Sequence, residues 1–526
     1  MSALRVVPKH DFGQGPHLKN LEGSTRGRYD MRDKRRSINL LQVGAKIDPE
    51  STVPLYVQLE ESIRTLILSH AIPVRTRLPS SRELAAILGL SRNTVIKAYD
   101  ALIGSGLLRP DRGSGTYAML PDQPPKRKAS PPRPSEDALP LPSESEDRYS
   151  ELTGSLHLSL PARPFRVNFP ALDAFPLRKW ASSTSRMLRH LAVDPKFRLL
   201  GEGHPSGEPR LRTAIAEHLR LARSVECSEK NILIFSGADQ ALDVILRLVL
   251  DRDDVIWCED PSYRGMTTAL SAHTDRVVPV PVDENGFDVE QAIARCPDAR
   301  AAYVFSSNHF PLGVTMSMDR RRKLLAWAET NRSWILDCDY DSELRYAGRP
   351  LPSLHSLDKI GSVIYIGTLS KITFPSLRIG YAVVPDSLLN ACIGARSVVG
   401  RFPILDQMLA ADFMESGELS QHLRRMRNLY RKRQTALLAS LARHAGDLVT
   451  VQPAAVGMQT IVWLKPGVSD IMVSEACAKI GIEALPMSAF TIETPRPSAL
   501  VLGFAAFDEQ QLDTAVIAVA EILRRL

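Results

Sequence analysis

A proline-rich segment near the end of the first quarter of the chain divides the sequence. The stretch PDQPPKRKASPPRPSEDALPLPSESED, residues 121–147, is rich in Pro, Ser and charge, so it cannot supply a packed core and is typical of an extended linker. With 526 residues, the chain also exceeds what one ordinary hydrophobic core holds. The sequence therefore predicts separate domains on either side of a linker at residues 120–160.

Basic residues are concentrated before this linker. Residues 1–135 carry 22 Lys and Arg against 12 Asp and Glu, whereas residues 136–526 carry 44 against 47. A basic region beside a near-neutral remainder is typical of a polyanion-binding module joined to another domain. Residues 1–50 are polar and lack apolar periodicity, so we expect a disordered basic arm there.

The sequence lacks the patterns of membrane and disulfide-rich proteins. It has no run of 18 apolar residues, and its first residues contain no apolar stretch typical of a secretory signal. The six cysteines form no CxxC pair and show no metal-ligand spacing. We therefore expect a cytoplasmic chain with no membrane span, no disulfide framework and no metal site.

Residues 51–119 contain the pattern of two short helices joined by a tight turn. Ser80 and Glu83 have the spacing of a capping box that starts the first helix, and Gly89 suits its end. Ser91 can cap the second helix. The apolar face of that helix has the spacing i, i+3, i+4, i+7 and consists of Val95, Ala98, Tyr99 and Leu102. This pattern predicts a helix-turn-helix.

Polar side chains at the start of the second helix suit contact with DNA. In a helix-turn-helix these positions meet base edges and phosphates in the major groove. The following stretch LLRPDRGSGTYA predicts a β-hairpin wing that contacts phosphate or the minor groove. The predicted contact residues are Arg92, Asn93, Thr94 and Lys97 on the helix, and Arg109 and Arg112 on the wing.

Residues 161–526 predict an α/β domain. Short β-branched runs such as NILIF, VIWCED and SVIYIG alternate with amphipathic stretches, as in a mostly parallel sheet covered by helices. We expect this large lobe at about residues 190–400. A small α+β lobe is expected at about residues 401–526.

The segment VIYIGTLSKITFPSLRIGY contains a candidate nucleophile. Lys371 follows a buried strand, where desolvation lowers the pKa of an amine and favours the neutral form that makes a Schiff base with an aldehyde. Ser370 and Arg378 supply a hydroxyl and a guanidinium suited to a phosphate. The segment predicts a catalytic Lys371 beside an anion site.

A second segment, NILIFSGADQALDVILRLVL, predicts a phosphate-binding turn. A strand leads through Ser236 and Gly237 into a long helix, so the backbone N–H groups of Gly237, Ala238 and Asp239 lie at a helix N-terminus. Further on, the aromatic ring of Tyr263 in EDPSYRG could stack on a planar ligand.

The stretch ILDCDYDSELRY, residues 335–346, places carboxylates behind an apolar run. Asp337, Asp339 and Asp341 would share one face of a strand, which suits either a divalent cation or an anchor for a cofactor. Because the lysine and phosphate segments point to an organic cofactor, we favour the second interpretation.

Together these stretches resemble the MocR subgroup of GntR-type regulators. Residues 54–118 resemble the GntR winged helix in LPSSRELA, LGLSRNTVIKAYDAL and RGSGTY. Residues from about 165 to 526 resemble a fold type I aminotransferase domain in EDPSYRG, FPLGVTMS, DYDSELRY and GTLSKITFPSLRIGY. The resemblance implies a homodimeric transcriptional regulator that binds double-stranded DNA and pyridoxal 5′-phosphate (PLP).

The resemblance also implies roles for individual residues. Lys371 would be the Schiff-base lysine, Arg378 would bind the phosphate, and Tyr263 would stack on the ring. Tyr340 would contact the phenolic oxygen of PLP, with Asn308 or His309 near the ring edge. Arg82, Ser91, Arg92, Asn93 and Thr94 occupy DNA-contact positions of the family.

Four positions depart from the family pattern. Cys338 replaces the aspartate that pairs with the protonated pyridine nitrogen, unless Asp339 or Asp337 reaches the ring instead. Asp239 replaces a neutral glutamine at the phosphate helix, and its charge repels a dianion. The other two are Glu202, in place of a tyrosine that reaches a neighbouring subunit's phosphate, and Val501, in place of the arginine that holds a substrate carboxylate.

Three functions remain open at this point. The first is a DNA-binding regulator whose aminotransferase-like domain senses PLP or a PLP-reactive amine or amino acid. The second is a PLP-dependent aminotransferase with an appended DNA-binding module. The third is a regulator whose domain has lost PLP and serves as a dimerisation scaffold. The sequence favours the first, because the loss of the carboxylate clamp and the pyridine partner disfavours transaminase turnover.

Overall fold

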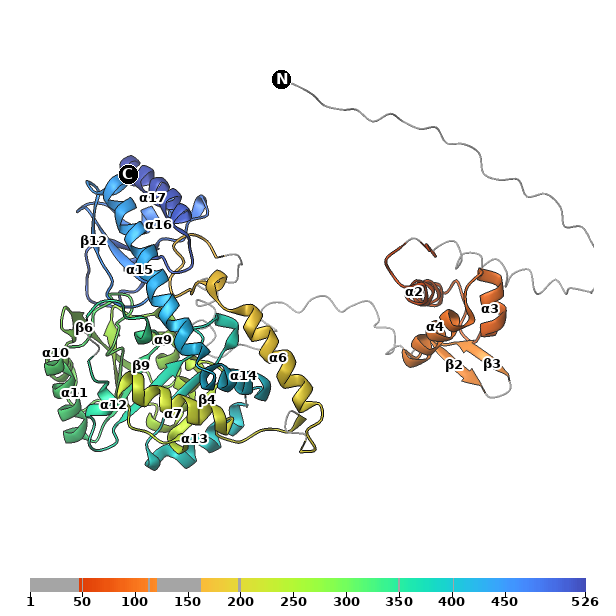
Figure 1. Ribbon diagram of the computed structural model, residues 1–526, viewed down its shortest axis with the longest axis horizontal. Coiled ribbons are helices and arrows are strands. Elements are labelled where there is room, and N and C mark those ends of the chain that lie inside the picture. Colours follow the sequence, from red (N-terminus) through yellow and green to blue (C-terminus); the bar gives the residue numbers. More distant parts are fainter. Residues whose placement is uncertain are drawn as a thin grey trace, which may run out of the picture. The chain divides into compact units, whose positions relative to one another are not determined.

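The computed structural model describes residues 47–49, 51–111, 114–120, 162–196, 200–348, 351–400 and 402–526. The chain divides into two compact units, Met1–Pro140 and Leu141–Leu526, and the division falls inside the predicted linker (Figure 1). The predicted arm, apart from residues 47–49, and the predicted linker, apart from residue 120, lie outside the described residues.

The N-terminal unit is a winged helix-turn-helix. Its helices are α2 (Leu55–Leu68), α3 (Ser81–Leu88) and α4 (Arg92–Gly104), and its strands are β1 (Arg77–Leu78), β2 (Leu108–Asp111) and β3 (Gly115–Ala118). The strands form an antiparallel sheet in the order β1-β3-β2.

Local sequence signals set the two helices of the turn as predicted. The Ser80 side chain accepts from the Glu83 N–H, and the Glu83 carboxylate accepts from the Ser80 N–H at 2.8 Å, which completes the capping box. Gly89 ends α3 in the left-handed conformation, with φ at 66°. The four predicted apolar residues of α4 are all buried and pack against α2 and α3.

The C-terminal unit is built on an eight-stranded mixed sheet in the order β4-β11-β10-β9-β8-β5-β6-β7. These strands are β4 (Ile232–Phe235), β5 (Val255–Asp260), β6 (Arg276–Asp283), β7 (Gly286–Phe287), β8 (Ala301–Val304), β9 (Trp334–Asp339), β10 (Val363–Thr368) and β11 (Gly380–Val383). The five central strands, from β10 to β6, run parallel, whereas β11 and β7 are antiparallel to their neighbours. The predicted α/β fold class is confirmed.

Helices cover both faces of this sheet (Figure 1). They are α6 (Leu177–Leu191), α7 (Pro209–Arg223), α8 (Ala238–Val249), α9 (Arg264–Ser271), α10 (Val289–Arg295), α11 (Met318–Asn331), α12 (Leu354–Leu357), α13 (Asp386–Val399) and α14 (Ile404–Glu415). One core cluster joins α7, α14 and α15 (Glu418–Ala445) to the sheet, and another joins α8 and α13 to it. Since both faces are buried, the side chains of a central strand alternate between two different interiors.

A small lobe completes the unit. Its antiparallel sheet has the order β12-β13-β15-β14, with strands β12 (Val449–Gln452), β13 (Gln459–Leu464), β14 (Leu485–Pro486) and β15 (Ala499–Gly503). The helices are α15 (Glu418–Ala445), α16 (Asp470–Lys479) and α17 (Glu509–Arg525), and α15 packs along α17. No helix in the described ranges is long and apolar enough to cross a membrane.

Candidate cofactor site and DNA-binding surface

The predicted cofactor residues lie just beyond the carboxyl ends of strands. Gly237 follows β4, Tyr263 follows β5, Asn308 follows β8, Tyr340 follows β9 and Lys371 follows β10. In α/β sheets, ligands bind outside the carboxyl ends of the strands. The topology therefore brings together segments that are far apart in the sequence.

Lys371 is partly buried, and its ammonium group has a backbone partner. Its Nζ donates to the carbonyl of Asn168, at 3.2 Å, on the segment that precedes α6. Burial, with a contribution from Arg378, lowers the pKa of Lys371, although the charges of Asp239 and Asp341 oppose that shift. A lowered pKa favours the neutral amine that reacts with aldehydes.

The turn between β4 and α8 is where the sequence predicts an anion site. Gly237 has φ at 96°, a conformation that favours glycine, and precedes the first residue of α8. Arg378 Nη2 donates to the Ser236 carbonyl at 3.3 Å. A Cβ on Gly380 would meet the carbonyl carbon of Gly237 at 2.2 Å, so only glycine there lets β11 approach this turn so closely.

Cys338 lies on the β9 face that packs against α8. It is 7% exposed and adjoins the hydroxyl of Tyr303 on β8. Burial raises the pKa of the Cys338 thiol well above its ordinary value, with smaller contributions from Asp339 and Asp337. This face of the strand therefore offers a neutral thiol and a neutral phenol instead of a carboxylate.

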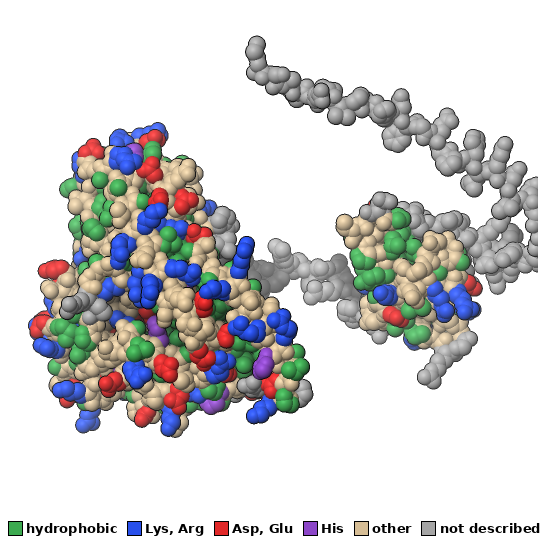
Figure 2. All heavy atoms as spheres, in the orientation of Figure 1, with side chains coloured by type: hydrophobic (Ala, Val, Ile, Leu, Met, Phe, Trp, Pro, Cys, Tyr) green, Lys and Arg blue, Asp and Glu red, His purple; other side chains and the backbone are tan. Residues whose placement is uncertain are grey.

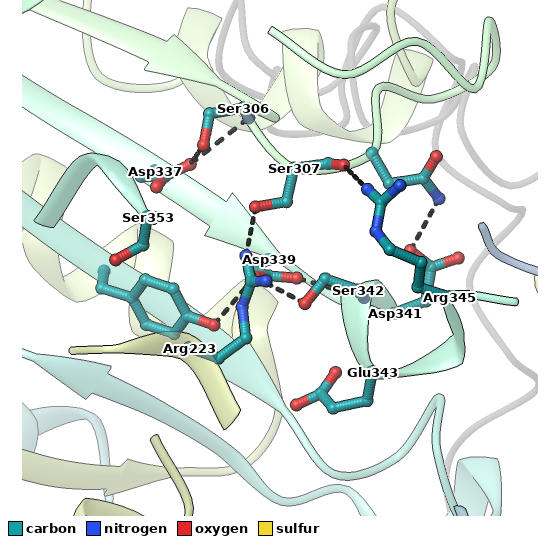
Figure 3. A network of polar contacts seen from close by, with 12 residues as sticks. Arg223, Ser306, Ser307, Asp337, Asp339, Asp341, Ser342, Glu343, Arg345 and Ser353 are labelled. Atoms are coloured by element: carbon teal, nitrogen blue, oxygen red, sulfur yellow. Dashed lines mark hydrogen bonds and ion pairs between the residues drawn. The ribbon is translucent and has the colours of Figure 1, made fainter. Parts of the chain in front are cut away.

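Asp339, which the sequence predicts at the cofactor, points to the opposite face from Cys338 and is paired within the chain. Figure 3 shows its carboxylate between Arg223, at the end of α7, and Ser342. Asp339 Oδ2 lies 2.7 Å from Arg223 Nη2 and accepts from the hydroxyls of Tyr365 at 2.9 Å and Ser342 at 2.8 Å. Four donors, counting the Ser342 N–H, thus surround this carboxylate.

These contacts control the ionisation of the buried pair. Burial alone would raise the pKa of Asp339, but Arg223 and the hydrogen bonds from Ser342 and Tyr365 hold it below its ordinary value. In turn, burial alone would lower the pKa of the Arg223 guanidinium, but Asp339, Tyr365 and Glu343 together raise it above its ordinary value. The pair is therefore ionised, and it ties α7 to the middle of the sheet.

The other carboxylates of ILDCDYDSELRY have separate partners. Asp337 accepts from the N–H and hydroxyl of Ser306, and Asp341 accepts from Asn308 Nδ2 at 2.8 Å. The carboxylates therefore do not converge on a cation, and among the described residues no group of three or more His, Cys, Asp or Glu is arranged for a metal.

Glu343 and Arg345, in the same stretch, have separate partners. Glu343 lies 3.3 Å from Nε2 of His218. Arg345 donates to the Ser307 carbonyl at 3.3 Å and to the Thr315 hydroxyl at 3.2 Å. Each side chain thus fastens a different neighbour to the loop after β9.

Polar atoms of the site residues test whether the site fits PLP. Among the described side chains, several buried polar atoms have no hydrogen-bond partner, and those of the predicted cofactor residues include Asn308 Oδ1 and Ser370 Oγ, whereas the Tyr340 hydroxyl adjoins Gln459. Buried polar groups are normally paired, so unpaired ones in one site suit a polar ligand. Tyr263, 45% exposed, offers a ring at the start of α9. The residues present therefore fit a planar, phosphorylated aldehyde such as PLP, with Asp239 and Cys338 as the two departures.

The DNA-binding surface of the N-terminal unit is exposed where the sequence predicts it. Arg82, Ser91, Arg92, Asn93, Lys97 and Arg109 are exposed, and Thr94 is half-buried. Lys and Arg side chains gather on one flank of this unit in Figure 2. Arg112 lies outside the described residues.

Several of these residues have structural contacts as well. Ser91 caps α4: its Oγ accepts from the Thr94 N–H at 3.1 Å and lies 2.8 Å from the Thr94 hydroxyl. The Lys97 ammonium lies over the ring of Tyr56, 5.6 Å from its centroid. Arg92 Nε also has a partner within the unit, since it donates to the Ser81 hydroxyl at 3.5 Å.

Comparison with known proteins identifies the family. The family model described as "Bacterial regulatory proteins, gntR family" matches residues 55–118, and "Aminotransferase class I and II" matches residues 169–519. The probable rhizopine catabolism regulatory protein MocR of Rhizobium meliloti is 36% identical over 89% of this chain and 93% of its own length. The chain belongs to the MocR subgroup of GntR-family regulators.

Another regulator and a solved aminotransferase structure are also similar to this MocR-type chain. The pyridoxine biosynthesis regulator PdxR of Corynebacterium glutamicum is 30% identical over 89% of this chain and 95% of its own. The structure of Pyrococcus horikoshii kynurenine aminotransferase, a complex with PMP, matches with a TM-score of 0.62 and 25% identity over 74% of this chain and 96% of that one. The MocR-type chain is thus a helix-turn-helix transcriptional regulator whose aminotransferase-like domain has PLP-dependent relatives.

Sequence reasoning missed several side chains of the MocR-type site. Asn168 contacts Lys371, Tyr303 contacts Cys338, and Gln459 on β13 contacts the Tyr340 hydroxyl. Asp341 is fully buried near Lys371, and burial raises its pKa to about 8. Only Asp341 carried a sequence signal, since it lies one residue beyond Tyr340. The others reach the site through tertiary packing.

Proposed function

We propose that this regulator binds PLP through Lys371 and that its DNA binding responds to PLP or to an amine that reacts with it. The observation that supports this proposal most strongly concerns Lys371. This lysine directly follows the end of a parallel strand, and its pKa is lowered. Around it lie an exposed aromatic ring, a helix N-terminus with an arginine, and unpaired buried polar atoms. PLP, when bound, supplies an aldehyde that condenses reversibly with primary amines.

The protein's own residues would bind and orient the cofactor. The backbone N–H groups at the start of α8 and the Arg378 guanidinium would hold the phosphate. The Tyr340 hydroxyl and the Asn308 amide would contact the ring substituents, and Tyr263 would cover one face of the ring.

Sensing is favoured over transamination by two residues. Cys338 is a buried neutral thiol, so it offers no charge to stabilise a protonated pyridine ring. Val501, where the family pattern has a carboxylate-binding arginine, is fully buried in β15 between β13 and β14. A site that binds PLP without these two groups suits an effector site more than efficient amino-acid turnover.

The DNA-reading half of the proposal concerns a homodimer in the cytoplasm. Helix-turn-helix regulators read paired half-sites with two copies of the recognition helix. The α4 surface presents Arg92 and Asn93, side-chain types that pair with guanine and adenine in the major groove.

The visible absorption spectrum tests PLP binding. Addition of PLP to the purified chain is expected to produce the absorption band of lysine-bound PLP, and Lys371→Ala is expected to abolish it. Cys392→Ala, which alters a buried residue of α13, serves as the control and should keep the band. A wild-type chain without the band would support the scaffold function instead.

A further inference from the structure

The phosphate-binding end of the proposed site contains a carboxylate of its own. Asp239 lies in the first turn of α8, and its Oδ2 is 3.5 Å from Nη2 of Arg378. The Asp239 side chain is 64% exposed and that of Arg378 is 53% exposed. The cation that would bind a phosphate already has an anionic partner within the chain.

Asp239 also faces the other groups of the site. Its charge raises the pKa of Tyr263, after the larger effect of burial, and opposes the lowering of the Lys371 pKa. The charge of Asp239 also contributes to the raised pKa values of the buried Cys338 thiol and the buried Tyr303 phenol. The carboxylate therefore lies close enough to the ligand volume to act on a charged ligand.

The Asp239 carboxylate would affect the binding of a phosphate dianion and of an uncharged hydroxyl differently. The dianion gains from the α8 N-terminus and Arg378, but it must displace or face the charge of Asp239. An uncharged 5′-hydroxyl can donate a hydrogen bond to the same carboxylate. The Arg378–Asp239 pair therefore favours ligands with little charge at this end.

We infer that Asp239 is a specificity-determining residue that removes most of the preference of this site for a phosphorylated ligand. The site accordingly accepts pyridoxal, the unphosphorylated aldehyde, with an affinity close to that for PLP. This inference rests on the proposed function, because it concerns the ligand that reaches Lys371.

The test compares PLP and pyridoxal binding to the wild-type chain and to Asp239→Asn. Dissociation constants come from the visible band and from tryptophan fluorescence. We expect Asp239→Asn to tighten PLP binding about tenfold and to change pyridoxal binding less than about twofold. Because the pair is exposed, the gain should shrink in about 1 M salt, where charges are screened within about 3 Å.

Asp243→Asn is the matched control, since it removes the same charge one turn further along α8, where Asp243 pairs with Arg247. It should leave the ratio of the two affinities unchanged. If the band forms but Asp239→Asn does not change that ratio, or changes it no more than the control does, the inference is overturned while the proposed function stands. If no band forms with either aldehyde in either protein, both are overturned.

Discussion

At Cys338 the choice between carboxylate and thiol decides how much chemistry this site supports. The thiol is buried against Tyr303, and the carboxylates on either side point into the opposite interior of the sheet. A PLP ring at this position would therefore meet a weak donor, worth less than the roughly 1.5–3 kcal/mol of a hydrogen bond to a charged group.

Substitution Cys338→Asp tests this position. Without ligand, the new carboxylate would be buried with no cation and should lower the free energy of unfolding by about 1–3 kcal/mol. PLP, whose ring nitrogen can carry a proton, should stabilise the variant more than it stabilises the wild type. Thermal unfolding with and without PLP measures both effects, and Cys338→Asn is the uncharged control. An equal PLP-induced shift in Cys338→Asp and Cys338→Asn would contradict the position assigned to this residue.

The ion pair between Arg223 and Asp339 gives a second prediction at the residue scale. Because the folded-state pKa of Asp339 lies below the ordinary value of about 3.9, this carboxylate adds stability above that pH and loses it as the pH falls through the folded-state pKa. Arg223→Met would leave the carboxylate buried without a cation, at a cost of about 3–5 kcal/mol near pH 7.

The sign of the pH dependence separates this cause from a simple packing defect. In Arg223→Met the pKa of Asp339 should rise, so the loss of stability should diminish as the pH is lowered from about 8 toward 5. Urea unfolding at several pH values measures it, with Arg223→Lys as the control that keeps a cation. A loss that does not vary with pH would point to packing alone.

At the scale of elements, the start of α4 combines a cap with a predicted DNA contact. Ser91→Ala removes the cap and should destabilise the N-terminal unit by about 1 kcal/mol. Ser91→Asp keeps a capping oxygen but places a negative charge next to the predicted phosphate contacts, so it should retain stability and lose DNA affinity. Denaturation and DNA titration of the two variants separate these roles. If Ser91→Asp binds DNA with wild-type affinity, this end of α4 does not lie at the DNA interface.

Strand β9 shows how far sequence reasoning reached at this scale. The apolar run, the strand and the alternation of its side chains were predictable, as were Lys371 and the turn before α8. The face used by the carboxylates was not, because both faces of a parallel sheet are buried and a period of two does not distinguish them. Contacts such as Asn168 with Lys371 join residues 203 positions apart and carry no local signal.

At the scale of the whole molecule, the order of the domains along the chain was predictable from the sequence. Linker composition, a capping box and a strand-end lysine predicted the domains, and the resemblance of motifs such as LGLSRNTVIKAYDAL and GTLSKITFPSLRIGY implied a GntR-type regulator with an aminotransferase-like domain, which the family comparisons confirm. The proposed function requires ligand binding in the C-terminal unit to be coupled to DNA binding by the N-terminal unit.

One prediction at this scale concerns DNA readout. Arg92→Ala should weaken binding to a specific operator by about 1–3 kcal/mol if its guanidinium reads a base. It should weaken binding to unrelated duplexes much less. A uniform loss on all sequences would instead assign Arg92 to the phosphates.

The coupling between the units is the central claim, and operator affinity tests it directly. An operator selected from a random duplex library would be titrated with wild-type chain and with Lys371→Ala, each with and without PLP. The account predicts that PLP changes the affinity of the wild type about fivefold or more and leaves that of Lys371→Ala unchanged. An affinity that ignores PLP in the wild type, or responds equally in Lys371→Ala, would contradict it.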